Sequence, residues 1–333
     1  MKLLATIFLS FLAIASFGQS ITSVSPSSAE RGTVQLPITI SGSGTSFTNA
    51  TSSVVEIYQG ANTIQILSIN SVQAGSVELD VRVSNLNPLG SYNVRVYDQN
   101  VGFVEMTNGF TVLANNNPPV LLNTSPEEGA TTQVLPVTIT TDNANFSQAT
   151  SNTIYLTQGT GTTIFPVPGS TTVLNDNAIR ATFDLSAYGL TSGTYLNAHC
   201  GNSFDGNFDD LGAIALTDAT EVGGTINYAG AYNGVVEVYQ ENTSLNPSTY
   251  SFVASTPVVG NTYVMTDLAE ATYLIRSVPI GMSDVVATYY PSNIVWQNAT
   301  SVTTVPGAPG VYDITPVTAI IASGMGITVN GAL

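Results

Sequence analysis

His199 and Cys200 are adjacent, and each is the single residue of its kind in the chain. A thiolate nucleophile needs a base that orients it and takes its proton. Neighbouring residues of a strand point to opposite faces, so His199 cannot serve Cys200 in this way. We therefore predict a buried structural cysteine. If Tyr195 faces the core, its parity conflicts with an inward Leu196 and Cys200, which predicts a bulge in this strand.

Asp205, Asn207 and Asp209 have the spacing with which a calcium-binding loop begins. Oxygen ligands at alternate positions can fold round a hard cation. Two later positions depart from the EF-hand pattern, because Asp210 stands where glycine is required and Leu216 where a bidentate glutamate belongs. The sequence favours a solvated acidic loop and leaves open a weak calcium site of another type. No other cofactor is predicted.

Tyr289, Tyr290 and Trp296 are aromatic residues close enough in sequence to form a platform for a sugar ring. The alternative is packing between strands, which is the commoner role of a lone tryptophan in a β-sandwich. The sequence leaves both interpretations open.

Catalytic constellations are not found in the sequence. Glu127-Glu128 and Asp209-Asp210 are pairs of adjacent acids. A glycosidase instead needs two carboxyl groups roughly 5 to 9.5 Å apart across a cleft. Phosphate-binding loops, zinc-ligand spacings and the Gly-x-Ser-x-Gly elbow have no match either. We expect that the protein is not an enzyme.

An internal repeat sets the domain organisation. The segment Leu36-Pro37-Ile38-Thr39-Ile40 returns as Leu135-Pro136-Val137-Thr138-Ile139. The offset of about a hundred residues is the length of one small sandwich domain and exceeds a solenoid repeat. Pro37 predicts that this first strong strand switches sheets at the proline.

Strand patterns extend through the whole chain. Val77, Leu79, Val81 and Val83 alternate with polar residues, as in a strand with one wet face. The third region has strand candidates at Thr225–Tyr228, Val235–Tyr239, Thr262–Met265 and Tyr273–Val278. A leucine precedes a tyrosine by a few residues in each region, which predicts three tyrosine corners: Leu86 and Tyr92, Leu190 and Tyr195, Leu268 and Tyr273.

These patterns predict an all-β chain of three tandem β-sandwich domains after a signal peptide. We expect the signal peptide at 1–18, where Lys2 precedes an apolar run too short to span a bilayer. The first domain covers 19–115, the second 118–217 and the third 221–321. Residues 322–333 would open a further module.

Charge and cysteine content restrict the partners and the compartment. The chain has 22 acidic residues against six basic ones, with a net charge of −16. Nucleic acid is excluded as a partner, because too few basic residues are present to neutralise phosphates. One cysteine allows no internal disulfide, so each sandwich depends on core packing.

The Ser-Pro pairs, the Leu-Pro-Ile/Val-Thr-Ile strand and the Gly-x-Tyr sequences of the first two domains resemble the immunoglobulin-like IPT/TIG modules of bacterial surface proteins. The third domain, with Asp267–Arg276 and Thr288–Pro291, resembles carboxypeptidase-regulatory-like (transthyretin-like) modules of proteins exported by type IX secretion. Both resemblances imply a β-sandwich fold and a secreted protein at the bacterial cell surface.

We therefore expect a non-catalytic extracellular stalk, spacer or adhesion segment with no membrane span. The alternative is a carbohydrate-binding accessory module with the glycan on the third domain. A surface glycan or a protein would be the partner, and edge strands could also pair between two copies of the chain.

Overall fold

The computed structural model describes residues 18–159, 161–244 and 249–319. The chain forms two compact units, and the boundary in the sequence lies between Pro118 and Pro119. The predicted signal peptide, except for Gly18, and the predicted module start at 322–333 lie outside the described residues. No helix in the described part of the chain is long and apolar enough to cross a membrane.

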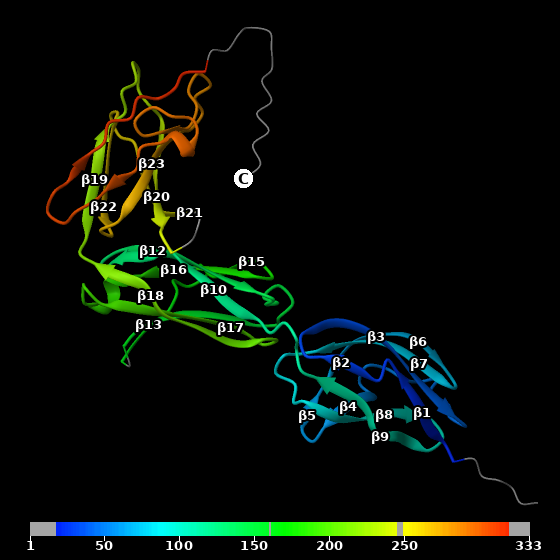
Figure 1. The fold of residues 1–333 in the computed structure, drawn as a ribbon. Helices are drawn as coiled ribbons and strands as arrows, with labels where there is room; N and C mark the ends of the chain where they lie inside the picture. The colour runs from blue at the N-terminus through cyan, green and yellow to red at the C-terminus, as the bar shows by residue number, and fades with distance from the viewer. Residues whose placement is uncertain (1–17, 160, 245–248, 320–333) are drawn as a thin grey trace, which may run out of the picture. The chain divides into compact units, whose positions relative to one another are not determined.

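Unit 1 is a sandwich of two sheets (Figure 1). The first sheet has the order β1 (Ser20–Ser25), β3 (Thr33–Ser43), β7 (Ser76–Val83), β6 (Gln65–Gln73). The second has the order β2 (Ser28–Glu30), β9 (Gly102–Leu113), β8 (Gly90–Asp98), β4 (Val55–Gln59), β5 (Asn62–Thr63). In immunoglobulin strand letters these are A-B-E-D and A′-G-F-C-C′, so the all-β, immunoglobulin-like prediction is confirmed by the strand order.

The chain changes sheets in a different place from the one predicted. β3 continues through Pro37 within one sheet, so the predicted switch at this proline is wrong. The change occurs between β1 and β2, on either side of Pro26. Pro37 is tolerated because β1 pairs with β3 only from Thr39 onward. No residue of β1 is therefore paired with position 37, where proline cannot donate a backbone hydrogen bond.

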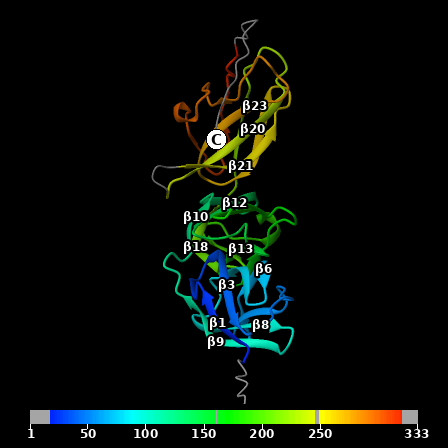
Figure 2. The ribbon, with the colours of Figure 1, turned by 90° about the vertical axis from the view of Figure 1, so that its right-hand side faces the viewer.

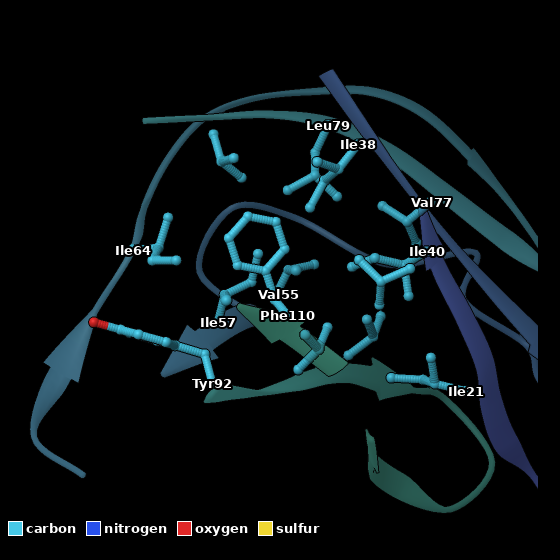
Figure 3. Packing of buried hydrophobic residues seen from close by; sticks show 14 of the residues in the cluster. Ile21, Ile38, Ile40, Val55, Ile57, Ile64, Val77, Leu79, Tyr92 and Phe110 are labelled. Atoms are coloured by element: carbon cyan, nitrogen blue, oxygen red, sulfur yellow. The ribbon is translucent and has the colours of Figure 1, made fainter. Parts of the chain in front are cut away.

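The core of unit 1 lies between its two sheets. All four apolar residues of the predicted alternation, from Val77 to Val83, are fully buried. Figure 3 shows Ile38, Leu79, Tyr92 and Phe110 directed into the same interior. The period-2 pattern is thus confirmed as a strand with one core face.

Unit 2 begins with a second sandwich of the same strand order. Its first sheet is β10 (Val120–Ser125), β12 (Val134–Asp142), β16 (Ala178–Asp184), β15 (Thr172–Asn175). Its second is β11 (Glu128–Ala130), β18 (Gly206–Thr217), β17 (Tyr195–Asn202), β13 (Asn152–Gln158), β14 (Thr162–Ile164). A short 3₁₀ helix, η1 (Leu185–Tyr188), follows β16. The sequence repeat therefore encodes a repeated topology.

A third hydrophobic core lies in the C-terminal half of unit 2. One sheet contains β22 (Thr262–Leu268), β19 (Thr220–Thr225) and β26 (Gly310–Val311). The other contains β21 (Thr249–Pro257), β20 (Gly234–Asn242), β23 (Thr272–Pro279) and β24 (Thr288–Tyr289), and β25 (Val302–Thr303) also pairs with β23. β20, β21 and β23 lie side by side in Figure 2.

Three of the four strands predicted in this region are confirmed. The candidate at Thr225–Tyr228 is wrong, because β19 ends at Thr225. β21 is additional to the prediction. Since the second and third cores share one compact unit, the division into three domains stays a prediction.

Two of the three predicted tyrosine corners are present. The Tyr92 hydroxyl donates to the Pro88 carbonyl at 2.9 Å, and the Tyr273 hydroxyl donates to the Ala269 carbonyl at 2.8 Å. The prediction for Tyr195 is wrong, because this side chain is 61% exposed and Leu196 is buried in its stead.

Strand register explains the exception. Between Tyr92 and Val94 the partner on β9 moves from Phe110 to Met106. Between Leu196 and Ala198 the partner on β18 moves in the same way, from Ile214 to Asp210. Leu196 is therefore the structural counterpart of Tyr92.

Candidate functional site

Cys200 has the structural role that the sequence predicts. It is buried, and burial, followed by the charges of Asp209 and Asp210, raises the pKa of its thiol to about 12. A thiol with so high a pKa is a poor nucleophile. The pairing of β17 with β18 is irregular between Leu196 and Ala198, where a bulge was predicted, but the extra residues lie on β18. Alternation along β17 itself is regular from Tyr195 to Cys200, and His199 points outward. The predicted conflict disappears because Tyr195 points outward too.

The three residues of the predicted calcium loop have separate surroundings. Asp205 accepts hydrogen bonds from the Asn145 backbone N–H at 2.7 Å and from Asn202 Nδ2 at 2.8 Å. Asp209 contacts His199, and Asn207 is exposed on β18. No group of three or more His, Cys, Asp or Glu side chains within the described ranges could hold a metal ion. Calcium binding stays a prediction.

The three aromatic residues of the predicted sugar platform also diverge. The Arg276 guanidinium lies over the Tyr289 ring, with its carbon 5.4 Å from the centroid of that ring. Tyr290 instead packs edge-on against Tyr312, with 5.5 Å between the ring centroids. Trp296, in the short 3₁₀ helix η2 (Trp296–Asn298), packs edge-on against Tyr250 at 5.8 Å and is 45% exposed. Only Trp296 keeps a large apolar surface open to a ligand.

Unit 2 contains the second and third sandwiches of the chain, the third being built round the third hydrophobic core. A set of hydrogen bonds joins these two sandwiches. The Glu127 carboxylate accepts from the backbone N–H groups of Thr243 and Ser244, each at 3.0 Å, and from both of their hydroxyl groups. The Thr132 hydroxyl donates to Asp267 at 2.8 Å. We call this contact region the junction.

Two cavities border the junction. The larger, of about 490 Å³, is lined by Leu122, Asn123, Thr124, Glu127, Glu128, Tyr195, Asp210, Gly212, Ala213, Ala215 and Ser244. The smaller, of about 310 Å³, lies between Thr132–Val134 and residues of β21 and β22. The larger cavity is lined by three carboxylates, those of Glu127, Glu128 and Asp210, and its described lining contains no basic residue.

Each sandwich also carries a row of three cross-strand neighbours centred on one basic side chain, which we call a ladder. In unit 1 the row is Glu56, Arg95, Glu105. In unit 2 the rows are Tyr155, His199, Asp209 and Glu237, Arg276, Tyr289. Asp209 and Tyr289, predicted for other roles, are thus members of ladders.

The Arg95 ladder is held by charge and by ring contacts. Arg95 donates from Nε and Nη2 to Glu56 Oε2, at 3.0 and 2.6 Å. Its guanidinium lies 4.9 Å from the centroid of the Tyr58 ring and 4.7 Å from that of Phe103. Phe103, beside the row, is 49% exposed, so this surface presents an arginine and an aromatic ring, which are enriched at protein interfaces.

The His199 ladder has the hydrogen-bond order of a hydroxyl nucleophile, a base and a carboxylate. The Thr157 hydroxyl contacts His199 Nε2 at 2.9 Å, and His199 Nδ1 contacts Asp209 at 2.7 Å. Acyl transfer also needs donors aimed at the developing oxyanion. Neither junction cavity is lined by Thr157 or His199. The contacts orient the imidazole, which stacks on Tyr155 at 4.6 Å.

Comparison with known proteins leaves the family open. No family model matches the chain, and no curated protein matches it either. Solved structures with some likeness include SGBP-B of Bacteroides ovatus in complex with a mixed-linkage heptasaccharide, at 13% identity, covering 71% of this chain and 67% of that one, with a TM-score of 0.22. The adhesin FdeC of Escherichia coli has 12% identity, coverage of 81% and 95%, and a TM-score of 0.21.

A tandem repeat from the extending region of a large adhesion protein has 13% identity, coverage of 90% and 74%, and a TM-score of 0.26. At such TM-scores none of these likenesses supports an inference about this chain. The immunoglobulin-like assignment rests on the strand order of the two sandwiches.

Proposed function

We propose that this chain is a non-catalytic extracellular segment of a bacterial surface protein, acting as a stalk or spacer in adhesion. The observation that carries the proposal is the junction of unit 2, where the Glu127 carboxylate engages Thr243 and Ser244. A spacer must hold neighbouring modules in a fixed relation. Four donors converging on one carboxylate provide such a link between two sandwiches.

Exposed contact surfaces support the adhesion part of this proposal. Phe103, which contacts Arg95, and its neighbour Tyr97 are both exposed, and their rings lie edge-to-face at 5.6 Å. These rings and the hydrogen-bonded Arg95 beside them are held in place before any partner arrives, which lowers the entropy that binding costs. The proposed secretion, and the kinship of the sandwiches with IPT/TIG and transthyretin-like modules, rest on the sequence motifs.

Glu127→Ala is expected to lower the free energy of unfolding of unit 2 by about 1 kcal/mol, because the donors of Thr243 and Ser244 lose their acceptor. The measurement is urea denaturation of residues 19–333. Asp142→Ala, which removes an exposed acid from β12, is the matched control and should change the free energy by less than about 0.5 kcal/mol. Equal effects of the two variants would argue against the junction as the stiff link of a spacer.

A second candidate function is glycan binding by the third sandwich. It is favoured by the exposure of Trp296 next to Ile294 and Val295, which are 60% and 47% exposed. Three consecutive exposed apolar residues are unusual on a surface that has no partner.

If this second function is correct, residues 19–333 should bind defined saccharides on a glycan array, and Trp296→Ala should weaken binding at least tenfold, or about 1.4 kcal/mol. Phe165→Ala removes an exposed aromatic ring from the second sandwich and serves as the control. An array without reproducible binding, or binding that Trp296→Ala leaves unchanged, removes this candidate.

A further inference from the structure

Glu128 has an unusual environment at the junction. It begins β11, and its backbone N–H donates to Gln240 Oε1 of β20 at 3.3 Å. Gln240 is fully buried. Oε2 of Glu128 is buried too and has no hydrogen-bond partner among the described residues. An ionised carboxylate is strongly destabilised in such a place, whereas a protonated one is tolerated.

The groups around Glu128 give its negative charge no compensation. Glu127 precedes it, and β18 contributes Asp210 to the same cavity. β17 adds Tyr195 to the lining, and β23 brings the buried Tyr273 within electrostatic range. Asp267 of β22 accepts a hydrogen bond from Thr132, which follows β11 in the chain. The charged members of this group are carboxylates, and the charge of Glu127 opposes the ionisation of Glu128.

We propose that Glu128 makes the junction sensitive to protons: the two sandwiches of unit 2 are held together while Glu128 is protonated, and their contact loosens when it ionises. The geometry that supports this is a buried, unpartnered carboxylate oxygen at the point where β11 meets β20, beside a second carboxylate that anchors the neighbouring loop. The inference concerns the junction itself and holds whether or not the chain is a stalk.

Burial, with the charge of Glu127 as the smaller cause, raises the pKa of Glu128 from 4.5 to about 7. Because the pKa is higher in the closed junction than in an open one, Glu128 favours closure fully below pH 4.5. The advantage is lost as the pH rises through about 7. In the closed junction Glu128 should therefore be mainly protonated at pH 5.5 and mainly ionised at pH 8.

Hydrogen exchange followed by mass spectrometry on residues 19–333 tests the proposal. Exchange is compared at pH 5.5 and pH 8 after correction for intrinsic rates. Protection of the Thr243 and Ser244 amides, which donate to Glu127 across the junction, should fall roughly tenfold or more at the higher pH. Protection of β7 in unit 1 is the internal control and should stay constant.

Two variants separate Glu128 from other groups. Glu128→Gln, which is neutral and nearly isosteric, should keep the protection of the Thr243 and Ser244 amides high at both pH values. Glu127→Gln removes the neighbouring charge and should move the midpoint of the loss to lower pH. Constant protection of the Thr243 and Ser244 amides in the wild type overturns the proposal by itself, as does a loss that persists in Glu128→Gln.

Discussion

Tyr92→Ala is expected to lower the free energy of unfolding of unit 1 by about 3 to 5 kcal/mol. The ring is fully buried among the residues shown in Figure 3, and its hydroxyl ties the preceding loop to β8 through the Pro88 carbonyl. Alanine leaves a cavity the size of a ring and an unsatisfied carbonyl. The loss is measured as the opening free energy of β7 in native-state hydrogen exchange of residues 19–333.

Tyr195→Ala is the control that the repeat itself supplies. Sequence comparison pairs Gly193-Thr194-Tyr195 with Gly90-Ser91-Tyr92, but the Tyr195 side chain is exposed. Its replacement should cost less than about 0.5 kcal/mol in the second sandwich. Comparable losses for the two tyrosines would contradict the register in which β17 pairs with β18.

Asp98→Ala should cost about 3 kcal/mol in unit 1, close to the upper end for a buried hydrogen-bonded group. The carboxylate is fully buried and accepts hydrogen bonds from the backbone N–H groups of Ser46 and Asn100. Removing it strands these donors inside the domain. The opening free energy of β7 reports the effect, and Glu78→Ala, on the wet face of the same domain, should leave that energy nearly unchanged.

Asp98 also makes the stability of unit 1 dependent on pH. Burial alone would raise the pKa of this carboxyl group, but the N–H groups of Ser46, Asn100 and Val101 outweigh it and lower the pKa below 3.8. The stabilisation is therefore present above pH 3.8 and is lost as the pH falls through the lowered pKa. Unit 1 should weaken in acid, and Asp98→Asn should flatten this part of the profile. An unchanged acid limb in Asp98→Asn would assign the effect to other carboxylates.

The opposite sign at Glu128 distinguishes the two units. Acid favours the junction of unit 2, whereas it weakens unit 1 once Asp98 protonates. Between about pH 3.8 and pH 4.5 both groups make their full stabilising contribution.

Local patterns were sufficient to predict much of this fold. The alternation of Val77 to Val83, the repeated Leu-Pro-Ile/Val-Thr-Ile strand and two of the tyrosine corners depend on residues close together in the chain, and the structure confirms them. Tyr195 is the exception. The irregular stretch of β18 between Asp210 and Ile214 sets the register of Leu196, and nothing near Tyr195 reveals it.

The ladders and the junction depend on contacts between distant residues. Arg95 and Glu56 are 39 positions apart, and Glu127 and Ser244 are 117 apart. An alternating pattern shows that Arg95 points outward, but it cannot say which strand lies beside it. For the same reason Asp209 and Tyr289, chosen as calcium and sugar residues, could not be paired with His199 and Arg276 from sequence alone.

The parallel pairing of β2 with β9, and of β11 with β18, has a mechanical consequence. In each immunoglobulin-like sandwich a segment near the start of the domain is hydrogen-bonded alongside its last strand, Ser28–Glu30 with Thr111–Leu113 and Glu128–Ala130 with Ala215–Thr217. Tension applied at the two ends of the domain pulls these strands in opposite directions along their length. Their hydrogen bonds are then loaded in shear and must break together, whereas a hairpin pulled from its open end unzips one bond at a time.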